Sequence, residues 1–177
     1  MDYGPDADCP RWEQFLLEIF DNDINMVRFI QRALGYSLSG DTREQCLFLC
    51  WVGGANGKST MLNLVRSMLG EYAANTPFST FELQYSNSNT NDLAALADRR
   101  LCTAAETSDA RRLNESRVKV ATGSDPVTAR YLYHENFTYI PQFKIWLAMN
   151  HKPRITGVDD GIWRPSSRSL NGRWKPG

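Results

Sequence analysis

The chain has 177 residues, of which 42% are hydrophobic and 23% are charged. This balance excludes an intrinsically disordered chain and suits one globular domain with a sizeable core. The 20 basic and 20 acidic residues cancel, so any contact with nucleic acid requires a local basic patch rather than overall charge.

Cysteine spacing and hydropathy bear on the compartment. The four cysteines, Cys9, Cys46, Cys50 and Cys102, lack the spacing of a zinc site, and two of them lie in an apolar run. We therefore expect buried free thiols and a reducing cytoplasm. No charged-then-apolar leader and no apolar run of membrane-spanning length is visible, so no membrane association is expected.

Two helices are predicted near the start of the chain. Apolar residues recur at helical spacing over 12–20 and again over 26–34. The polar stretch 21–23 separates the two helices and can cap the second. Gly35 and Gly40 are expected to end the second helix. These helices would form a small cap before the rest of the domain.

A glycine-rich stretch follows the first apolar strand, which is predicted over 46–52. Its residues are Gly53, Gly54, Ala55, Asn56, Gly57, Lys58, Ser59 and Thr60. A turn of this kind directs backbone N–H groups at phosphate, at the start of a helix. We expect Lys58 to reach the β- and γ-phosphates of ATP and the Ser59 hydroxyl to ligate Mg²⁺. Val52 replaces the first glycine of the strict pattern, and an ordinary strand–helix turn is the alternative.

Two further apolar strands are predicted over 101–105 and 143–149, and they are followed by Glu106 and Asn150. Apolar strands that alternate with helices indicate a parallel α/β sheet. Ligands bind at the carboxyl edge of such sheets, where Lys58, Glu106 and Asn150 would converge. Glu106 can orient the attacking water or hold Mg²⁺ through water. A solvated glutamate at a strand end is the alternative.

Helical and hairpin segments are predicted between these strands. Residues 85–91 are almost all Ser, Asn and Thr and predict a loop, after which Asp92 can cap a short helix. A polar helix is expected over about 109–121. Aromatic and β-branched residues over 126–133 and 137–140 predict a β-hairpin.

Four motifs, in this order, resemble those of the superfamily 3 helicases. They are Gly-Gly-Ala-Asn-Gly-Lys-Ser-Thr at 53–60, Ala-Glu-Thr at 105–107, Thr-Gly-Ser-Asp-Pro-Val-Thr-Ala-Arg at 122–130 and Pro-Gln-Phe-Lys-Ile-Trp-Leu-Ala-Met-Asn-His-Lys-Pro-Arg at 141–154. The resemblance is to the helicase domain of phage and plasmid primases, related to the poxvirus primase-helicase. It implies an AAA+-like P-loop NTPase core with a parallel sheet and an inserted β-hairpin.

The resemblance also implies cofactors, partners and a location. The expected cofactors are ATP and Mg²⁺, and the expected assembly is a homo-oligomeric ring, usually a hexamer, that moves along single-stranded DNA. Its expected partners are a primase domain or other replication proteins. The expected origin is a phage or prophage, and the expected location is the cytoplasm of the bacterial host.

Roles carry over onto matching residues of the core. By the resemblance, Lys58 and Ser59 bind ATP and Mg²⁺, Glu106 is the Walker B acid that also serves the metal, and Asn150 is the sensor. Arg164 matches an arginine that is expected to contact the γ-phosphate of the ATP bound to a neighbouring subunit. A solvated surface arginine is the alternative.

The inserted hairpin of the resembled family projects into the pore of the ring. The residues that occupy it here are Arg130, Tyr131, Tyr133 and His134. Cations and aromatic rings suit a phosphate backbone and stacked bases. An ordinary solvated hairpin with core tyrosines is the alternative.

Two departures from the resembled pattern lie late in the chain. Ser124 stands where a second glycine is usual, and Pro165 interrupts the segment after Arg164. We expect a helical segment over 1–42, the P-loop ATPase core over 43–164 and an irregular, truncated tail over 165–177. A remnant that binds nucleotide or DNA without turnover, and a P-loop kinase, remain as alternatives.

Overall fold

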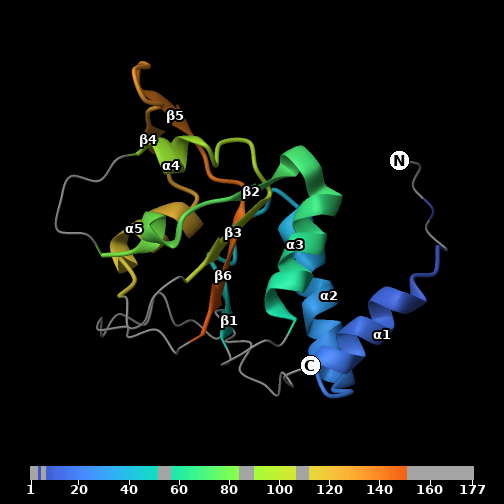
Figure 1. Ribbon diagram of the computed structural model, residues 1–177. Helices are drawn as coiled ribbons and strands as arrows, with labels where there is room; N and C mark the ends of the chain where they lie inside the picture. Colours follow the sequence, from blue (N-terminus) through green and yellow to red (C-terminus); the bar gives the residue numbers. More distant parts are fainter. Residues whose placement is uncertain (1–3, 5–6, 52–56, 84–89, 107–111, 151–177) are drawn as a thin grey trace.

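The computed structural model describes residue 4 and residues 7–51, 57–83, 90–106 and 112–150. These residues form a mixed α/β fold with a parallel sheet (Figure 1). In chain order the elements are α1 (Pro10–Ile19), α2 (Ile24–Leu38), β1 (Leu47–Trp51), α3 (Lys58–Leu69), η1 (Gly70–Tyr72), β2 (Ala73–Asn75), η2 (Phe78–Phe81), α4 (Asn91–Ala94), β3 (Leu101–Ala105), α5 (Glu115–Thr122), β4 (Val127–Ala129), β5 (Phe137–Tyr139) and β6 (Lys144–Met149).

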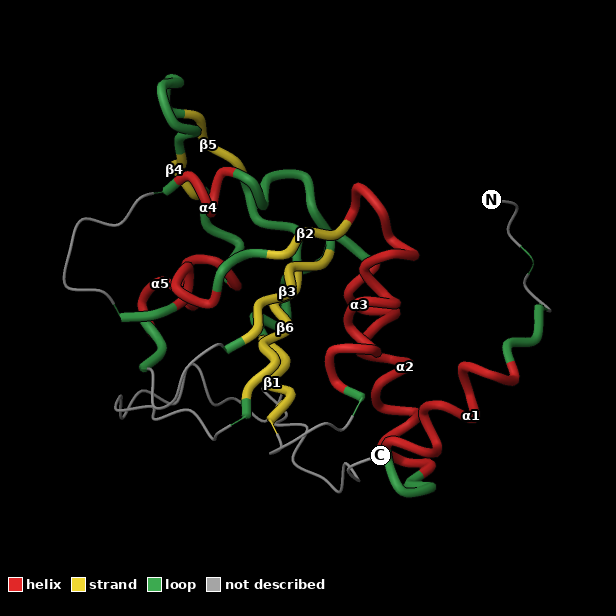
Figure 2. Tube along the Cα trace, viewed as in Figure 1, coloured by secondary structure: helices red, strands yellow, loops and turns green. Residues whose placement is uncertain are grey.

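The main sheet has four parallel strands in the order β1-β6-β3-β2. The last strand of the described residues, β6, therefore lies in the interior of the sheet, between β1 and β3. Helices α2 and α3 lie on one side of the sheet, and α5 lies on the other (Figure 2). Strands β4 and β5 pair antiparallel as a separate hairpin, at the end of the sheet from which β6 starts (Figure 1).

Both faces of the sheet are buried, which explains why its strands are apolar runs without alternation. On one face Phe48, Cys50 and Trp146 pack against α1, α2 and α3. On the other face Leu49, Ala104 and Leu147 pack against η2, α4, α5 and the hairpin. In the described part of the chain, no helix is long and apolar enough to cross a membrane.

Helix α2 is tied to the sheet through a buried tryptophan. The indole of Trp146 stacks on Phe48, with ring centroids 4.4 Å apart. Its Nε1–H donates to the hydroxyl of Ser37 over 3.0 Å, and Ser37 in turn donates to the carbonyl of Ala33. The indole N–H and the serine hydroxyl are thus both satisfied in the core.

Most helix boundaries lie where the sequence predicts them. The predicted end of α2 at Gly35 and the predicted extent of the polar helix are wrong. The Asp23 carboxylate caps α2, as predicted, by accepting from the amides of Asn25 and Met26. Gly35 does not end α2, which continues to Leu38 because its last turn packs on the sheet through Ser37. The polar helix expected over 109–121 is shorter in the described residues: α5 begins after Asn114, whose side chain caps it.

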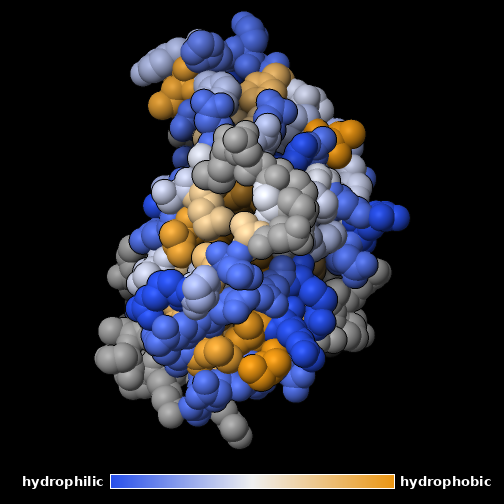
Figure 3. Space-filling model, turned by 90° about the vertical axis from the view of Figure 1, so that its right-hand side faces the viewer, coloured by the Kyte–Doolittle hydropathy of each residue, from blue (hydrophilic) through white to orange (hydrophobic). Residues whose placement is uncertain are grey.

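The face that carries α1, α2 and α3 has a mixed surface. Figure 3 shows its hydrophobic side chains in separate patches among hydrophilic ones. The exposed apolar residues of α2, α3 and η1 are Ile24, Leu38, Leu64, Met68 and Tyr72. Scattered exposed apolar residues of this kind are ordinary in a folded domain.

Candidate functional site

Three neighbouring strands end at the same level of the sheet. Trp51, the last residue of β1, lies opposite Met149 of β6, and Ala105, the last residue of β3, lies opposite Ala148. The chain therefore leaves β1, β6 and β3 along one edge, as the sequence predicts. In parallel α/β sheets this carboxyl edge is where ligands bind.

Glu106 and Asn150 meet at this edge. The backbone amide of Glu106 donates to the carbonyl of Ala148 over 2.8 Å, which extends the pairing of β3 with β6 by one residue. The backbone amide of Asn150 donates to the Glu106 carboxylate over 3.3 Å. The carboxylate, on a partly exposed residue, is thus turned toward the end of β6. The structure brings these two predicted residues together through the main chain of Asn150.

Helix α3 begins beside this edge with a glycine in the left-handed region. Gly57 caps the helix with φ of 77°, a conformation that side chains disfavour. A Cβ built on Gly57 would lie 2.7 Å from Cγ2 of Ile19, so α1 packs directly on this turn. The predicted residues Gly53, Gly54, Ala55 and Asn56 lie outside the described residues.

Lys58 is the first residue of α3 and is only 4% exposed. Burial lowers the pKa of its ammonium, and the nearby Cys50 partly opposes that change. Burial also raises the pKa of the Cys50 thiol to about 12, so this cysteine stays protonated. Ser59 and Thr60 are exposed in the first turn of α3. Helix α3 therefore starts with a buried cation followed by two exposed hydroxyls.

The hairpin residues form a second group, away from this edge. Arg130, Tyr131, Tyr133 and His134 lie in or beside the segment that joins β4 to β5, at the opposite end of the sheet (Figure 1). Tyr133 is fully exposed and has φ of 63°, and Arg130 and His134 are exposed. The structure therefore divides the predicted residues between two ends of one sheet.

Tyr131 differs from the other predicted hairpin residues because its side chain both donates a hydrogen bond and stacks on another ring within the protein. Its hydroxyl donates to the carbonyl of Ala94 over 2.9 Å. Its ring stacks on Phe137 with centroids 5.6 Å apart. The predicted Arg164 and the tail over 165–177 lie outside the described residues.

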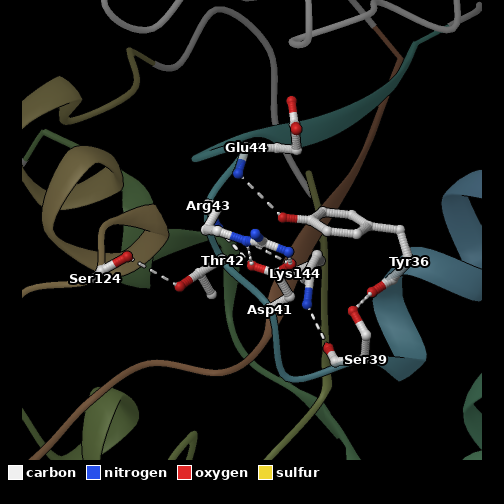
Figure 4. Close-up of polar contacts among 8 residues, drawn as sticks. All are labelled: Tyr36, Ser39, Asp41, Thr42, Arg43, Glu44, Ser124 and Lys144. Atoms are coloured by element: carbon white, nitrogen blue, oxygen red, sulfur yellow. Dashed lines mark hydrogen bonds and ion pairs between the residues drawn. The ribbon is translucent and has the colours of Figure 1, made fainter.

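A buried lysine at the start of β6 is absent from the sequence-based predictions. Lys144 is 2% exposed; its ammonium lies 4.4 Å from the centroid of the Tyr36 ring and donates to the carbonyl of Ser39 (Figure 4). Burial lowers its pKa to about 8, which the nearby Asp41 partly opposes. The only sequence signal is a lysine within an otherwise apolar run.

The chain belongs to the family described as "Family of unknown function (DUF5906)", which it matches over residues 51–165. The matched region contains the end of β1, α3, Glu106, the hairpin and β6. The family therefore spans both ends of the sheet at which the predicted residues lie.

Two curated viral relatives place the chain among longer proteins. It is 34% identical over 144 residues to "Putative helicase L207/L206" of Acanthamoeba polyphaga mimivirus, covering 80% of this chain and 15% of that protein. It is 29% identical over 125 residues to "Putative primase C962R" of African swine fever virus, covering 68% of this chain and 13% of that protein. The chain thus spans about one seventh of each relative's length.

The fold is similar to that of a solved structure, the C-terminal region of NrS-1 in its apo form. The TM-score is 0.61 at 13% identity, with 86% of this chain and 37% of that one covered. This similarity supports the mixed α/β fold with its parallel sheet.

Proposed function

We propose that this chain is the ATP-dependent helicase domain of a viral or phage replication protein, of the superfamily 3 type. It would couple ATP hydrolysis to movement along single-stranded DNA. One observation carries the proposal: at the carboxyl edge of the sheet the backbone amide of Asn150 donates to the Glu106 carboxylate, and α3, whose first residue is Lys58, starts at the same end of the sheet (Figure 1). The helicase and primase names of the viral relatives support the same class of protein.

The residues at this edge fit a magnesium nucleotide. Gly57 lacks a side chain that could cap α3 or cover its first amides, and Lys58 adds a positive charge at the same place. Mg²⁺ is usually held by one or two protein groups together with substrate phosphates. Ser59 and Glu106 are the two groups that would hold it here.

Each residue then has a distinct task. Bound magnesium ATP supplies the phosphoanhydride that is cleaved and the divalent charge beside it. Lys58 stabilises negative charge on the phosphates, and Ser59 offers its hydroxyl to the metal. Glu106 orients the attacking water and accepts its proton. Asn150 holds the Glu106 carboxylate in place through its backbone N–H.

Single-stranded DNA would bind at the other end of the sheet, whereas a neighbouring subunit would contribute to the nucleotide site. We propose that Arg130 and His134 contact phosphates of single-stranded DNA and that Tyr133 stacks on a base. Assembly as a hexameric ring would bring Arg164 of a neighbouring subunit to each ATP. A primase domain or other replication proteins would be the remaining partners.

ATP hydrolysis measured with and without single-stranded DNA tests this proposal. A helicase domain hydrolyses ATP faster when oligothymidylate is added. A chain that binds nucleotide but shows no turnover would instead be a binding-only remnant, and a kinase would respond to a small acceptor rather than to DNA. Size-exclusion chromatography with ATP and oligothymidylate tests ring formation.

A further inference from the structure

We infer that α4 holds the hairpin in place and that Tyr131 is a positioning residue, rather than a base-stacking residue, for contacts made by Arg130, Tyr133 and His134. The inference rests on the proposed function, which assigns those contacts to single-stranded DNA. It starts from four hydrogen bonds between the hairpin and the segment that starts at Thr90 and contains α4.

Two of these bonds come from main-chain amides of the segment that joins β4 to β5. The amide of Arg130 donates to the hydroxyl of Thr90, and the amide of Leu132 donates to the side-chain oxygen of Asn91, each over 3.2 Å. The residue between them, Tyr131, is thereby flanked by two attached amides. The backbone at Arg130 is fixed relative to the start of α4.

The other two bonds come from tyrosine hydroxyls. Tyr131 donates to the carbonyl of Ala94 over 2.9 Å, and Tyr139 donates to the carbonyl of Leu93 over 2.7 Å. Burial raises the pKa of Tyr139, so this phenol keeps its donor proton to a higher pH than an exposed tyrosine does. Both acceptors belong to α4, which has only four residues. A helix this short depends on tertiary contacts for its stability.

The tyrosine rings join the two strands of the hairpin to the same anchor. Tyr131 stacks on Phe137, and Phe137 lies 5.9 Å from Tyr139 between ring centroids. One face of the Tyr131 ring and its hydroxyl are therefore already occupied by protein. Tyr133, two residues later, is fully exposed. Tyr133, rather than Tyr131, thus offers a free ring to a base.

Helix α4 is itself fixed to the main sheet by buried hydroxyls. Thr80 donates its single hydroxyl proton to the Asp92 carboxylate over 3.1 Å, so the 2.7 Å contact between Thr76 and Thr80 must be donated by Thr76. The amide of Thr76 donates to the carbonyl of Thr103 on β3. Thr76 and Thr80 are 4% and 1% exposed. The anchor of the hairpin is therefore continuous with the strand that ends before Glu106.

Removal of a single hydroxyl tests the inference. In the full chain with a non-hydrolysable ATP analogue, Tyr131→Phe keeps the ring on Phe137 and removes only the bond to Ala94. We expect its affinity for labelled oligothymidylate to fall roughly fivefold, the scale of one lost hydrogen bond. Tyr72→Phe, the matched control, removes the hydroxyl of an exposed tyrosine on η1, outside the hairpin, and should bind like the wild type.

Salt dependence and a double-mutant cycle separate positioning from direct contact. Tyr131→Phe should leave the salt slope unchanged, whereas Arg130→Ala should reduce it by about 0.7 for one lost phosphate contact. In the Arg130→Ala background, Tyr131→Phe should cost less than in the wild type, because it acts partly through Arg130. Amide exchange at Arg130 and Leu132 should quicken in Tyr131→Phe without DNA, while exchange in β6 stays unchanged.

The outcomes distinguish this inference from the proposed function. If the wild type binds oligothymidylate and Tyr131→Phe binds equally well, or if its loss is the same in the Arg130→Ala background, Tyr131 does not position Arg130. If the wild type does not bind oligothymidylate at all, the DNA part of the proposed function is wrong, and the inference fails with it.

Discussion

The backbone amide of Asn150 donates to the carboxylate of Glu106 over 3.3 Å, across the ends of two adjacent strands. The side chain that would activate water is thus held by the strand that carries the proposed sensor residue. Because the donor is a main-chain N–H, the bond survives any substitution at residue 150 except proline. Asn150 therefore has its amide side chain left for a second task at the exposed edge.

Glu106→Gln should uncouple nucleotide binding from hydrolysis. The glutamine oxygen can still accept from the Asn150 amide, so the fold and ATP affinity should persist. Turnover should fall about a hundredfold or more, because the amide cannot take a proton from water. The measurements are ATP affinity by calorimetry and steady-state hydrolysis. Glu71→Gln, which changes an exposed carboxylate on η1, is the control. Equal loss of binding and turnover would make Glu106 a structural or metal-holding residue.

Lys58→Met should remove nucleotide affinity while the fold persists. Methionine keeps an unbranched apolar stem at this 4% exposed position but removes the charge proposed to face phosphate. We expect affinity for ATP to fall about tenfold to a hundredfold, the scale of a lost charged hydrogen bond.

The chain offers a matched control for this experiment. Lys144→Met replaces another buried lysine, at the amino end of β6 and therefore at the opposite edge of the sheet. It should leave ATP affinity unchanged. Equal losses in the two variants would show that the effect comes from perturbed packing, and an unchanged affinity in Lys58→Met would refute the assignment of Lys58.

Long apolar strands and the first two helices follow from the sequence, whereas β2 does not. Strands β3 and β6 are apolar runs followed by the polar Glu106 and Asn150, and β1 is an apolar run that leads into the glycine-rich stretch. The predicted ranges agree with the three strands to within a residue or so. Strand β2 spans only Ala73–Asn75, and its two alanines carry little strand preference. It exists because it pairs with β3, from Ala73 opposite Leu101 to Asn75 opposite Thr103.

Contacts between distant segments could not be predicted from sequence either. The bonds from Tyr131 to Ala94 and from Tyr139 to Leu93 join residues 37 and 46 apart in the chain. No local pattern distinguishes these tyrosines from the exposed Tyr133. The placement of β6 between β1 and β3 is likewise a property of the assembled sheet. The existence of the hairpin could therefore be predicted from its amino-acid composition, but its attachment to α4 could not.

Gly57→Ala should destabilise the protein, and Gly35→Ala should stabilise it. Alanine at residue 57 must adopt φ of 77°, which costs about 1–2 kcal/mol, and its Cβ would also meet Ile19 at 2.7 Å. Gly35 lies inside α2 with nothing within 4 Å of a built Cβ, so alanine there should add about 0.5–1 kcal/mol. Urea unfolding measures both changes.

A double-mutant cycle isolates the contact between α1 and the start of α3. Ile19→Ala removes the atom that a Cβ at residue 57 would meet, so it should relieve part of the cost of Gly57→Ala. The double variant should then be more stable than the sum of the single changes predicts. Strict additivity would mean that the backbone conformation of Gly57 alone, and not its packing on α1, requires glycine.

Lys144 should make the stability of the protein rise with pH above about 8. Burial lowers the pKa of Lys144 from its usual 10.5 to about 8. Below that pH the ammonium is charged in both the folded and unfolded states, and the folded state bears the cost of burying it. Between pH 8 and 10.5 the folded protein has released the proton while the unfolded chain retains it, so stability rises, by at most about 1.4 kcal/mol per pH unit.

Comparison of the wild type with Lys144→Met between pH 7 and 10 isolates this contribution. The groups that face Lys144 include Tyr36, Asp41, Cys46 and Arg100. Burial raises the pKa of both Tyr36 and the Cys46 thiol. In the folded state these two groups stay protonated at higher pH than in the unfolded chain, so they lower stability as the pH rises. They are present in both proteins, and their effect largely cancels in the difference.

The free energy of unfolding of the wild type, relative to that of Lys144→Met, should therefore increase from pH 8 upward. A difference that stays flat across this range would show that Lys144 remains protonated in the folded state, held by Ser39 and the Tyr36 ring.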